Sequence, residues 1–334
     1  MAFSAGRRPR DPGDGGDGHF ADMLAGMAHV TGEQFDLTLM ASTGRISATV
    51  TEVGAGIRRL SIDGVDLVPP YDADVQRPAA SGIVLVPWPN RVRDGLWRLD
   101  GAPQQLDITE VDRANAIHGL LRFTSYRVSA RTEASITLGA RVNPQHGYPF
   151  ALETSVTYEL VDAGLEVTHR VTNMADAPAP VALGAHPFFT IGDVEPEDLT
   201  LTLACATHID VDDRMLPVGE TPVEGTDLDL RQGRRLVELT LDDGYADAEM
   251  HDGICEHHLA APDGRTVTVW GDENFAYWQV FTTATYPGQS KALAIEPMTA
   301  PADAFNSGRG LRWVAPSETW QASWGVRADG FARV

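Results

Sequence analysis

The chain contains 334 residues, of which 43% are hydrophobic, enough to build a sizeable core. Its 26 basic and 47 acidic residues give a formal net charge of −21. That charge argues against sequence-independent nucleic-acid binding and against docking on an anionic membrane surface. The 32 glycines and 21 prolines predict many turns and few long helices. The two cysteines are far apart, which excludes a disulfide framework and a cysteine-rich zinc site.

Residues 1–30 are expected to form a disordered N-terminal tail. Arg7 and Arg8 are followed by a polar, glycine-rich stretch, whereas an export signal needs an apolar segment there. No apolar run approaches the ~18 residues of a membrane span. Met23 and Met27 are also plausible translation starts. These features predict a cytoplasmic protein with a single domain over residues 31–334.

From about residue 31, apolar side chains alternate with polar ones at the period of a β-strand. The clearest runs cover 136–142, 156–160, 165–171, 199–211, 266–270 and 278–283. The sequence Asp162-Ala163-Gly164 predicts a tight turn that joins the second and third runs into a hairpin. No window keeps a helical period over three turns, and no linker divides the region. The pattern predicts an all-β fold, one large and mainly antiparallel β-sandwich.

Four segments interrupt this alternation and concentrate polar side chains. In the first, Pro87 and Pro89 stiffen the backbone around Trp88 and present Asn90 and Arg91 in fixed directions. Asparagine supplies a donor and an acceptor and arginine supplies a fork of donors, which together suit vicinal hydroxyls or a carboxylate. On local evidence alone, a rigid turn with a solvated arginine is the favoured interpretation of this segment.

The second and third segments each contain a histidine followed by a residue that shapes the backbone. Gly119 follows His118 and permits a bulge or a close approach of another backbone segment. Pro187 follows His186 and restricts it to an extended conformation. Phe188, beside this proline, can lower the local dielectric or stack on the apolar face of a sugar. Taken singly, each histidine is also compatible with a purely structural role.

The fourth segment places Glu296 at the end of the apolar run 292–295. A carboxylate in such a run is costly unless it is hydrogen-bonded or functional. Burial raises the pKa of a carboxyl group and suits it to general-base work. Together the four segments offer an acid and a base, without a nucleophilic serine or cysteine motif or a phosphate loop. They also lack the ligand set of a metal cage, so we expect no metal.

Two weaker clusters favour structural interpretations. His257 and His258 are adjacent, so on a strand they would point to opposite faces and would not chelate one ion. Asp242, Asp243 and Asp247 surround a Gly-Tyr pair, and their spacing alone indicates a solvated loop.

In their order along the chain, the four segments resemble the aldose 1-epimerase (galactose mutarotase) family. The resemblance rests on Asn90-Arg91, His118-Gly119, His186-Pro187 and Glu296-Pro297. It extends from about residue 35 to the C-terminus, and the Pro-Trp-Pro-Asn-Arg and Glu-Pro-Met-Thr forms look most similar to a bacterial branch. It implies a β-supersandwich and cofactor-free interconversion of the α and β anomers of a monosaccharide.

The resemblance also implies residue roles. Glu296 would take the proton from the C1 hydroxyl, His186 would protonate the ring oxygen, and His118 would help to hold the sugar. The expected substrate-binding residues are Arg91, Asn90, Asp242, Gln279, Trp88 and Phe188. Asp247 is a rival for the position of Asp242. Opposite charges on Glu296 and His186 are expected to support each other and to give a bell-shaped kcat/KM profile.

Three other functions compete with this interpretation. A non-catalytic carbohydrate-binding sandwich needs no acid and base. A glycoside hydrolase or lyase needs two carboxylates, which Glu296 and Asp242 would supply. A protein-interaction sandwich would make the motifs coincidental. Thr190 and Met298 depart from residues common in the family, which leaves the sugar open. The expected partner is one monosaccharide, and the expected assembly is a monomer or a homodimer.

Overall fold

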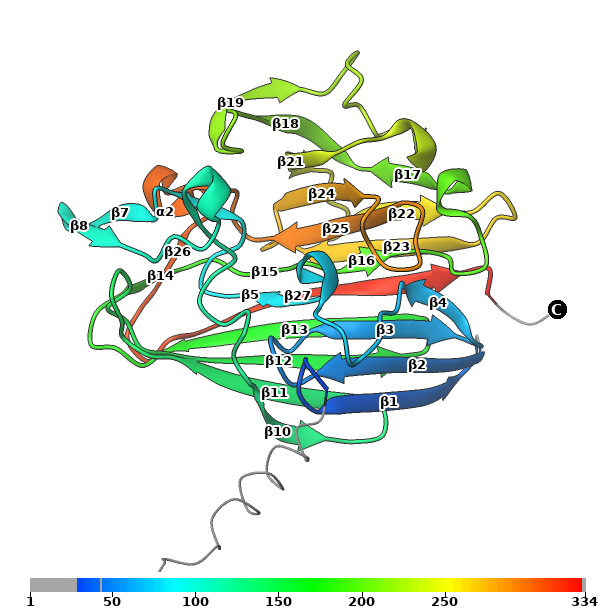
Figure 1. Ribbon diagram of the computed structural model, residues 1–334, viewed down its shortest axis with the longest axis horizontal. Coiled ribbons are helices and arrows are strands. Elements are labelled where there is room, and N and C mark those ends of the chain that lie inside the picture. The colour runs from blue at the N-terminus through cyan, green and yellow to red at the C-terminus, as the bar shows by residue number, and fades with distance from the viewer. Residues whose placement is uncertain (1–28, 43, 332–334) are drawn as a thin grey trace, which may run out of the picture.

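A computed structural model describes residues 29–42 and 44–331 of the chain (Figure 1). The tail predicted over residues 1–30 falls almost entirely outside this part. Strands dominate the described residues, in agreement with the all-β prediction. The short α2 (Ala304–Ser307) is accompanied by 3-10 turns at η1 (Pro78–Ala80), η2 (Val111–Arg113), η3 (Pro196–Asp198) and η4 (Leu236–Glu238). Within the described ranges, no helix is long and apolar enough to cross a membrane.

Two large antiparallel sheets form the body of the molecule. The 9-stranded sheet contains, in spatial order, β10 (Arg127–Arg131), β11 (Ser135–Val142), β12 (Leu152–Val161), β13 (Gly164–Asn173), β27 (Thr319–Asp329), β23 (Thr266–Asp272), β22 (Ile254–Ala260), β17 (Thr200–Leu203) and β20 (Arg234–Arg235). The 8-stranded sheet contains β19 (Pro217–Pro222), β18 (Cys205–Val211), β21 (Asp242–Ala248), β24 (Tyr277–Thr283), β25 (Ala292–Met298), β15 (Gly184–Ala185) and β5 (Val84–Leu85), with β16 (Phe188–Phe189) also paired to β25. In Figure 1, β10 lies at the bottom and β19 at the top.

Smaller sheets complete the fold. A 4-stranded sheet of β1 (Gln34–Ala41), β2 (Gly44–Thr51), β3 (Ile57–Ile62) and β4 (Val65–Val68) lies against β11 and β12. Two-stranded pairs are formed by β6 (Arg91–Arg93) with β9 (Asn115–Ile117), β7 (Leu96–Leu99) with β8 (Ala102–Gln105), and β14 (Ala179–Val181) with β26 (Arg312–Val314). The β6–β9 pair brings the Asn-Arg and His-Gly segments together, because Arg91 is in register with Ile117.

The predicted hairpin is confirmed, whereas the long run over 199–211 is not one strand. Strands β12 and β13 pair up to Val161 and Gly164 at the turn. The run divides at Ala204 into β17 of the 9-stranded sheet and β18 of the 8-stranded sheet. At the crossing, the Ala204 N–H donates to Nδ1 of buried His257 at 3.1 Å. An alternating pattern indicates which face of a strand is buried, but it does not indicate to which sheet the strand belongs. The sequence therefore did not predict the break at Ala204.

The acidic cluster around Gly244 and Tyr245 is also corrected, because it forms strand β21 rather than a solvated loop. Tyr245 is 1% exposed, and β21 pairs with β18 on one side and β24 on the other. Asp243 is tolerated there because His208 of β18 lies 2.9 Å from its carboxylate. Burial of the tyrosine and two-sided pairing outweigh the low strand propensity of aspartate.

The register of the 8-stranded sheet aligns polar residues on one face. Gly244 of β21 lies opposite Gln279 of β24, which lies opposite Glu296 of β25. Residues in register across neighbouring strands share a face. Trp278 and Ile295, one position away, therefore point to the other face and are fully buried. The hydrophobic core lies on that side, which leaves the face of Glu296 available for a site.

Candidate active site

One cavity brings together most of the side chains singled out in the sequence. Its volume is about 310 Å³, near the lower end of the ~300–1,000 Å³ typical of small-molecule sites. We call it the polar cavity. It is lined by Ala79, Ala80, Asn90, Arg91, Arg113, Ile117, His118, His186, Asp242, Gln279, Phe281 and Glu296. Its size suits one small ligand.

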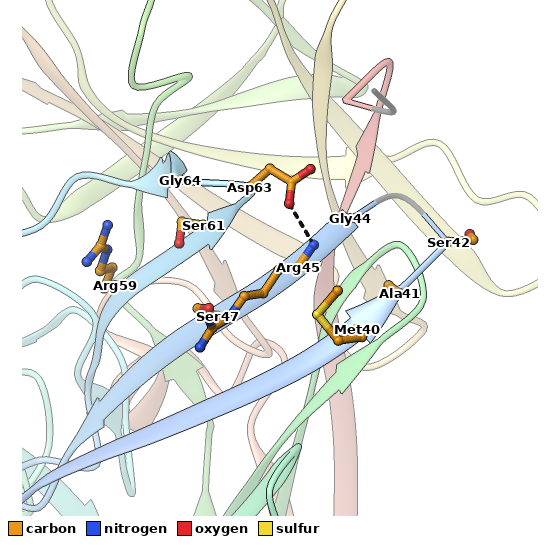
Figure 2. A pocket seen from close by; sticks show the side chains of 10 residues that line it. All are labelled: Met40, Ala41, Ser42, Gly44, Arg45, Ser47, Arg59, Ser61, Asp63 and Gly64. Carbon is orange, nitrogen blue, oxygen red and sulfur yellow. Dashed lines mark hydrogen bonds between the residues drawn. The ribbon is translucent and has the colours of Figure 1, made fainter. Parts of the chain in front are cut away.

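A larger cavity of about 740 Å³ lies elsewhere, on the outer face of β1–β3 (Figure 2). Figure 2 shows Arg45, Arg59 and serine side chains there, with Asp63 accepting from the Arg45 backbone N–H. Its lining within the described residues contains neither a histidine nor a glutamate. Volume alone therefore does not identify the site, whereas the polar cavity brings a buried glutamate and two histidines together.

Glu296 is held in the floor of the polar cavity by β25, a strand whose residues are all buried. Its carboxylate oxygen Oε1 lies 3.3 Å from Nε2 of His186, and the residue is 2% exposed. The second oxygen, Oε2, has no hydrogen-bond partner among the described residues. An unsatisfied buried oxygen is costly, and in a cavity it is suited to a ligand hydroxyl.

His186 lies between the short strands β15 and β16, where Pro187 interrupts regular pairing. Its backbone is fixed on both sides, because its N–H donates to the Ile83 carbonyl at 3.0 Å and its carbonyl accepts from Gly82 at 2.7 Å. Its ring stacks on Phe188 at 5.5 Å between centroids. These contacts set the direction of the ring toward Glu296.

His118 completes the pair of histidines, with its ring 5.4 Å from that of His186 and nearly perpendicular to it. Its φ is +63°, and its N–H donates to the Asn90 carbonyl at 2.9 Å. The following Gly119 has φ +71°, and a Cβ there would lie 2.1 Å from the Val86 carbonyl oxygen. The glycine is therefore required for the close approach expected from the sequence.

Burial governs the protonation of the acid–base pair. It raises the pKa of Glu296 well above its usual value; nearby Asp242 adds to the rise, whereas Arg91 opposes it. Burial lowers the pKa of His186 to about 4. It also lowers the pKa of His118, with further contributions from the charges of His186 and Arg91.

Both shifts oppose the expected resting ion pair and favour a neutral pair, a protonated Glu296 beside a neutral His186. The expectation of an ion pair rested on the attraction between opposite charges. The cost of removing both groups from water opposes that attraction and is the largest cause of both pKa shifts. The neutral pair and the ion pair hold the same single proton and differ only by its position.

A continuous hydrogen-bond network forms one wall of the polar cavity. Gln279 Nε2 donates to Asp242 Oδ1 at 2.8 Å, and Asn90 Nδ2 donates to Gln279 Oε1 at 3.1 Å. Arg91 Nη1 donates to Asn90 Oδ1 at 3.3 Å, and Nη2 lies 3.8 Å from Asp242 Oδ2. Each side chain fixes the next, so the wall presents donors and acceptors in defined directions.

The sequence analysis missed Glu110, which fixes Arg91 from behind. Its carboxylate accepts from Arg91 Nε at 2.9 Å and Nη2 at 3.0 Å, and also from Asn115 and Arg113. Although burial works to raise it, these hydrogen bonds hold the pKa of Glu110 below its usual value. Its only sequence signal was a group of polar residues a few positions before His118.

Two expected aromatic contacts and one rival aspartate lie outside the lining. Trp88 is 2% exposed, and its ring packs against Phe305 at 5.4 Å. Phe188 is fully buried behind His186, and Phe281 lines the cavity instead. Asp247 accepts from Thr207 at 2.6 Å and is not in the lining, whereas Asp242 is. Large apolar side chains are mostly buried in the core of a folded protein, which explains why the predicted sugar contacts of Trp88 and Phe188 are wrong.

The described residues contain no group of three or more His, Cys, Asp or Glu side chains arranged to hold a metal ion. His257 is fully buried and His258 is partly exposed, as their positions on one strand predicted. The side chains of the polar cavity supply proton donors and acceptors, two guanidinium groups and two amides. This set can bind hydroxyls and move protons between oxygens.

Comparison with known proteins places these observations in a family. A sequence profile described as aldose 1-epimerase matches residues 36–327. The protein YihR of Escherichia coli K12, described as uncharacterised, is 32% identical over 273 residues, which are 81% of this chain and 86% of that protein.

Solved structures share the fold at lower identity. A GalM/aldose epimerase homologue from C. elegans has a TM-score of 0.77 and 20% identity, over 89% of this chain and 99% of that one. A galactose 1-epimerase from Lactobacillus acidophilus NCFM has a TM-score of 0.72 and 19% identity, over 87% of this chain and 93% of that one. The fold is therefore galactose mutarotase-like, and the chain belongs to the aldose 1-epimerase family.

Proposed function

We propose that this protein is an aldose 1-epimerase that interconverts the α and β anomers of a monosaccharide. The observation that carries the proposal is the contact between Glu296 Oε1 and His186 Nε2, 3.3 Å apart in a cavity of about 310 Å³. One carboxyl and one imidazole sharing a single proton are the groups that ring opening and closure require. The family membership supports the same reaction class.

Ring opening transfers one proton from the sugar to Glu296 and one proton from His186 to the sugar. Binding of the sugar favours transfer of the proton from Glu296 to His186, because the C1 hydroxyl then donates to the carboxylate. Glu296 takes the C1 hydroxyl proton as the C1–O5 bond breaks, and His186 delivers a proton to O5. An open-chain aldehyde forms beside a neutral pair. Rotation about C1–C2 and the reverse transfers close the ring on the other face.

Burial favours the neutral Glu296–His186 pair, which is also the state of the pair beside the open-chain sugar. Protonated Glu296 and neutral His186 are the forms whose pKa values burial supports. Positioned acids and bases contribute ~10²–10⁴-fold each, which is about 3–5 kcal/mol of barrier apiece. Because burial also favours the neutral pair before the sugar binds, the ionised pair that starts ring opening has to be formed with the help of the bound C1 hydroxyl.

The remaining lining residues are proposed to hold the sugar. Arg91, Asn90, Gln279 and Asp242 form the wall that would bind ring hydroxyls. His118, whose Nδ1 has no hydrogen-bond partner among the described residues, would donate to the substrate or accept from it. Phe281 is the aromatic side chain available to the C–H face of the sugar. The sugar itself is to be identified by experiment.

Proton NMR of anomeric exchange across a panel of freshly dissolved α-aldoses tests the proposal. We expect catalysed exchange with at least one sugar. We also expect Glu296→Gln and His186→Asn each to lower kcat by 10²-fold or more while circular dichroism shows an intact fold. Spontaneous exchange rates with every sugar, or wild-type turnover by either variant, would contradict it. Release of reducing ends from a glycoside would instead support a hydrolase.

A further inference from the structure

A second cavity of about 370 Å³ adjoins the polar cavity, and Ala80 lines both. We call it the arginine cavity, because Arg77 and Arg122 are the charged side chains in its described lining. The chain as a whole has a net charge of −21. A pocket whose charged groups are all cationic is therefore at odds with the rest of the molecule.

Arg122 carries a charge that the protein does not compensate. Its side chain is half-buried, and burial lowers its pKa. Among the described residues, no carboxylate forms an ion pair with it, and its guanidinium carbon lies over the ring of Phe123, 4.8 Å from the ring centroid. Removing a charge from water without a counter-charge is costly. An unpaired, half-buried guanidinium beside a cavity is available to an anionic ligand.

Arg77 is held in place by neutral groups alone. Its Nη2 donates to the Thr51 hydroxyl at 2.7 Å and to the Val53 carbonyl at 2.6 Å, and its Nε donates to the Tyr71 hydroxyl at 3.2 Å. These bonds orient the guanidinium without neutralising it, and none of them uses Nη1.

The two arginine segments meet at Gly54. A Cβ at this glycine would lie 2.7 Å from Arg77 Nη1 and 2.8 Å from the Arg122 carbonyl oxygen. Gly54 has φ +68°, so its backbone also favours glycine. The glycine keeps Arg77 Nη1 and the Arg122 segment close together without a side chain between them.

We propose that the arginine cavity binds a small oxyanion, such as a phosphate or carboxylate group, between Arg77 and Arg122. Guanidinium groups match the geometry of these anions with paired N–H donors. The anion is either a free solute or a substituent of the sugar whose ring occupies the polar cavity. The second source rests on the proposed function, whereas the first does not.

The arginine cavity is electrostatically connected to the polar cavity. The charge of Arg122 is one cause of the lowered pKa of His118. An oxyanion at Arg122 would offset that charge and shift the His118 pKa back toward its usual value. Ala80, which lines both cavities, has a φ of 57°, and Ala79, which lines the polar cavity, has a φ of 43°. Backbone strain of this kind is concentrated at functional sites.

Isothermal titration of the full chain with inorganic phosphate and with glucose 6-phosphate tests the proposal. We expect saturable binding of at least one probe, weakened by rising salt. Arg122→Gln should weaken it by tenfold or more. Arg98→Gln, the same charge change on the β7–β8 hairpin away from both cavities, should alter it less than twofold. Arg122→Lys keeps the charge and should retain part of the binding.

The arms of this experiment separate the two sources and the two proposals. A free oxyanion predicts phosphate binding that survives Glu296→Gln. A sugar-borne oxyanion predicts that Arg122→Gln weakens glucose 6-phosphate binding but leaves glucose binding unchanged. Oxyanion binding without anomeric catalysis would support this site and reject the proposed function. Absence of saturable binding of either probe to the wild-type chain, or equal binding by folded Arg122→Gln, would overturn the inference.

Discussion

Replacement of Gly119 by alanine should damage both the stability and the activity of the protein, and Gly101 provides a matched control. Both glycines have positive φ, +71° and +82°. A Cβ at Gly101 meets nothing within 4 Å, whereas a Cβ at Gly119 would lie 2.1 Å from the Val86 carbonyl oxygen. The two variants therefore share the backbone strain and differ in the collision.

The magnitude follows from the contacts around each glycine. A left-handed conformation costs an L-residue about 1–2 kcal/mol, which is the expected loss for Gly101→Ala. In Gly119→Ala, displacing the Val86 carbonyl also weakens its bond from Leu120 N–H at 2.8 Å and the neighbouring bond from His118 N–H to Asn90 O at 2.9 Å. At about 0.5–1.5 kcal/mol for each hydrogen bond, the total loss is about 2–5 kcal/mol.

Urea unfolding followed by circular dichroism measures both losses, and anomeric NMR exchange measures kcat/KM. We expect Gly101→Ala to keep wild-type activity, because it lies on the β7–β8 turn. We expect Gly119→Ala to lose activity tenfold or more, because His118 moves with its backbone. If Gly119→Ala is no less stable than Gly101→Ala, the collision is relieved without cost, and the argument that glycine positions His118 is refuted.

Three further predictions concern titratable groups. With the His186 pKa lowered to about 4, the loss of kcat/KM on the acid side of the pH profile should begin only as pH approaches 4. An acid-side loss near pH 6.5 in NMR exchange would show an unperturbed histidine. Because the Glu296 pKa is raised, its contribution to stability is present below about 4.5 and is lost as pH rises through the folded value. The free energy of unfolding of Glu296→Gln should therefore increase relative to that of the wild type as pH rises. A pH-independent difference between the two would contradict the raised pKa of Glu296. His208 lies 2.9 Å from the carboxylates of both Asp210 and Asp243, and the hydrogen bond to Asp243 is the largest cause of its raised pKa. His208→Asn should therefore lower the free energy of unfolding by about 1–2 kcal/mol below pH 6.5. This loss should fade as pH rises through the folded pKa of His208, which unfolding at several pH values will check.

The all-β fold and the family were predictable because the features that indicate both occur within short segments of the sequence. Alternating burial needs only the period of one strand, as the β12–β13 hairpin shows. The four polar segments each combine a functional side chain with a proline or a glycine, and the polar cavity contains Asn90, His118, His186 and Glu296 from all four. Local backbone restraint and strand period are properties of neighbouring residues, so one sequence carries them.

Other features were decided by contacts between residues distant in the chain. Trp88 is of a residue type that often stacks on sugars, yet it is buried in the core against Phe305, which lies more than 200 positions away in the chain. Glu110 acquires its role only because β6 and β9 pair and bring Arg91 within its reach. The protonation of Glu296 and His186 depends on how much water the assembled sheets exclude. Desolvation is a property of the packed molecule, so only the tertiary structure determines the charge state of these two residues.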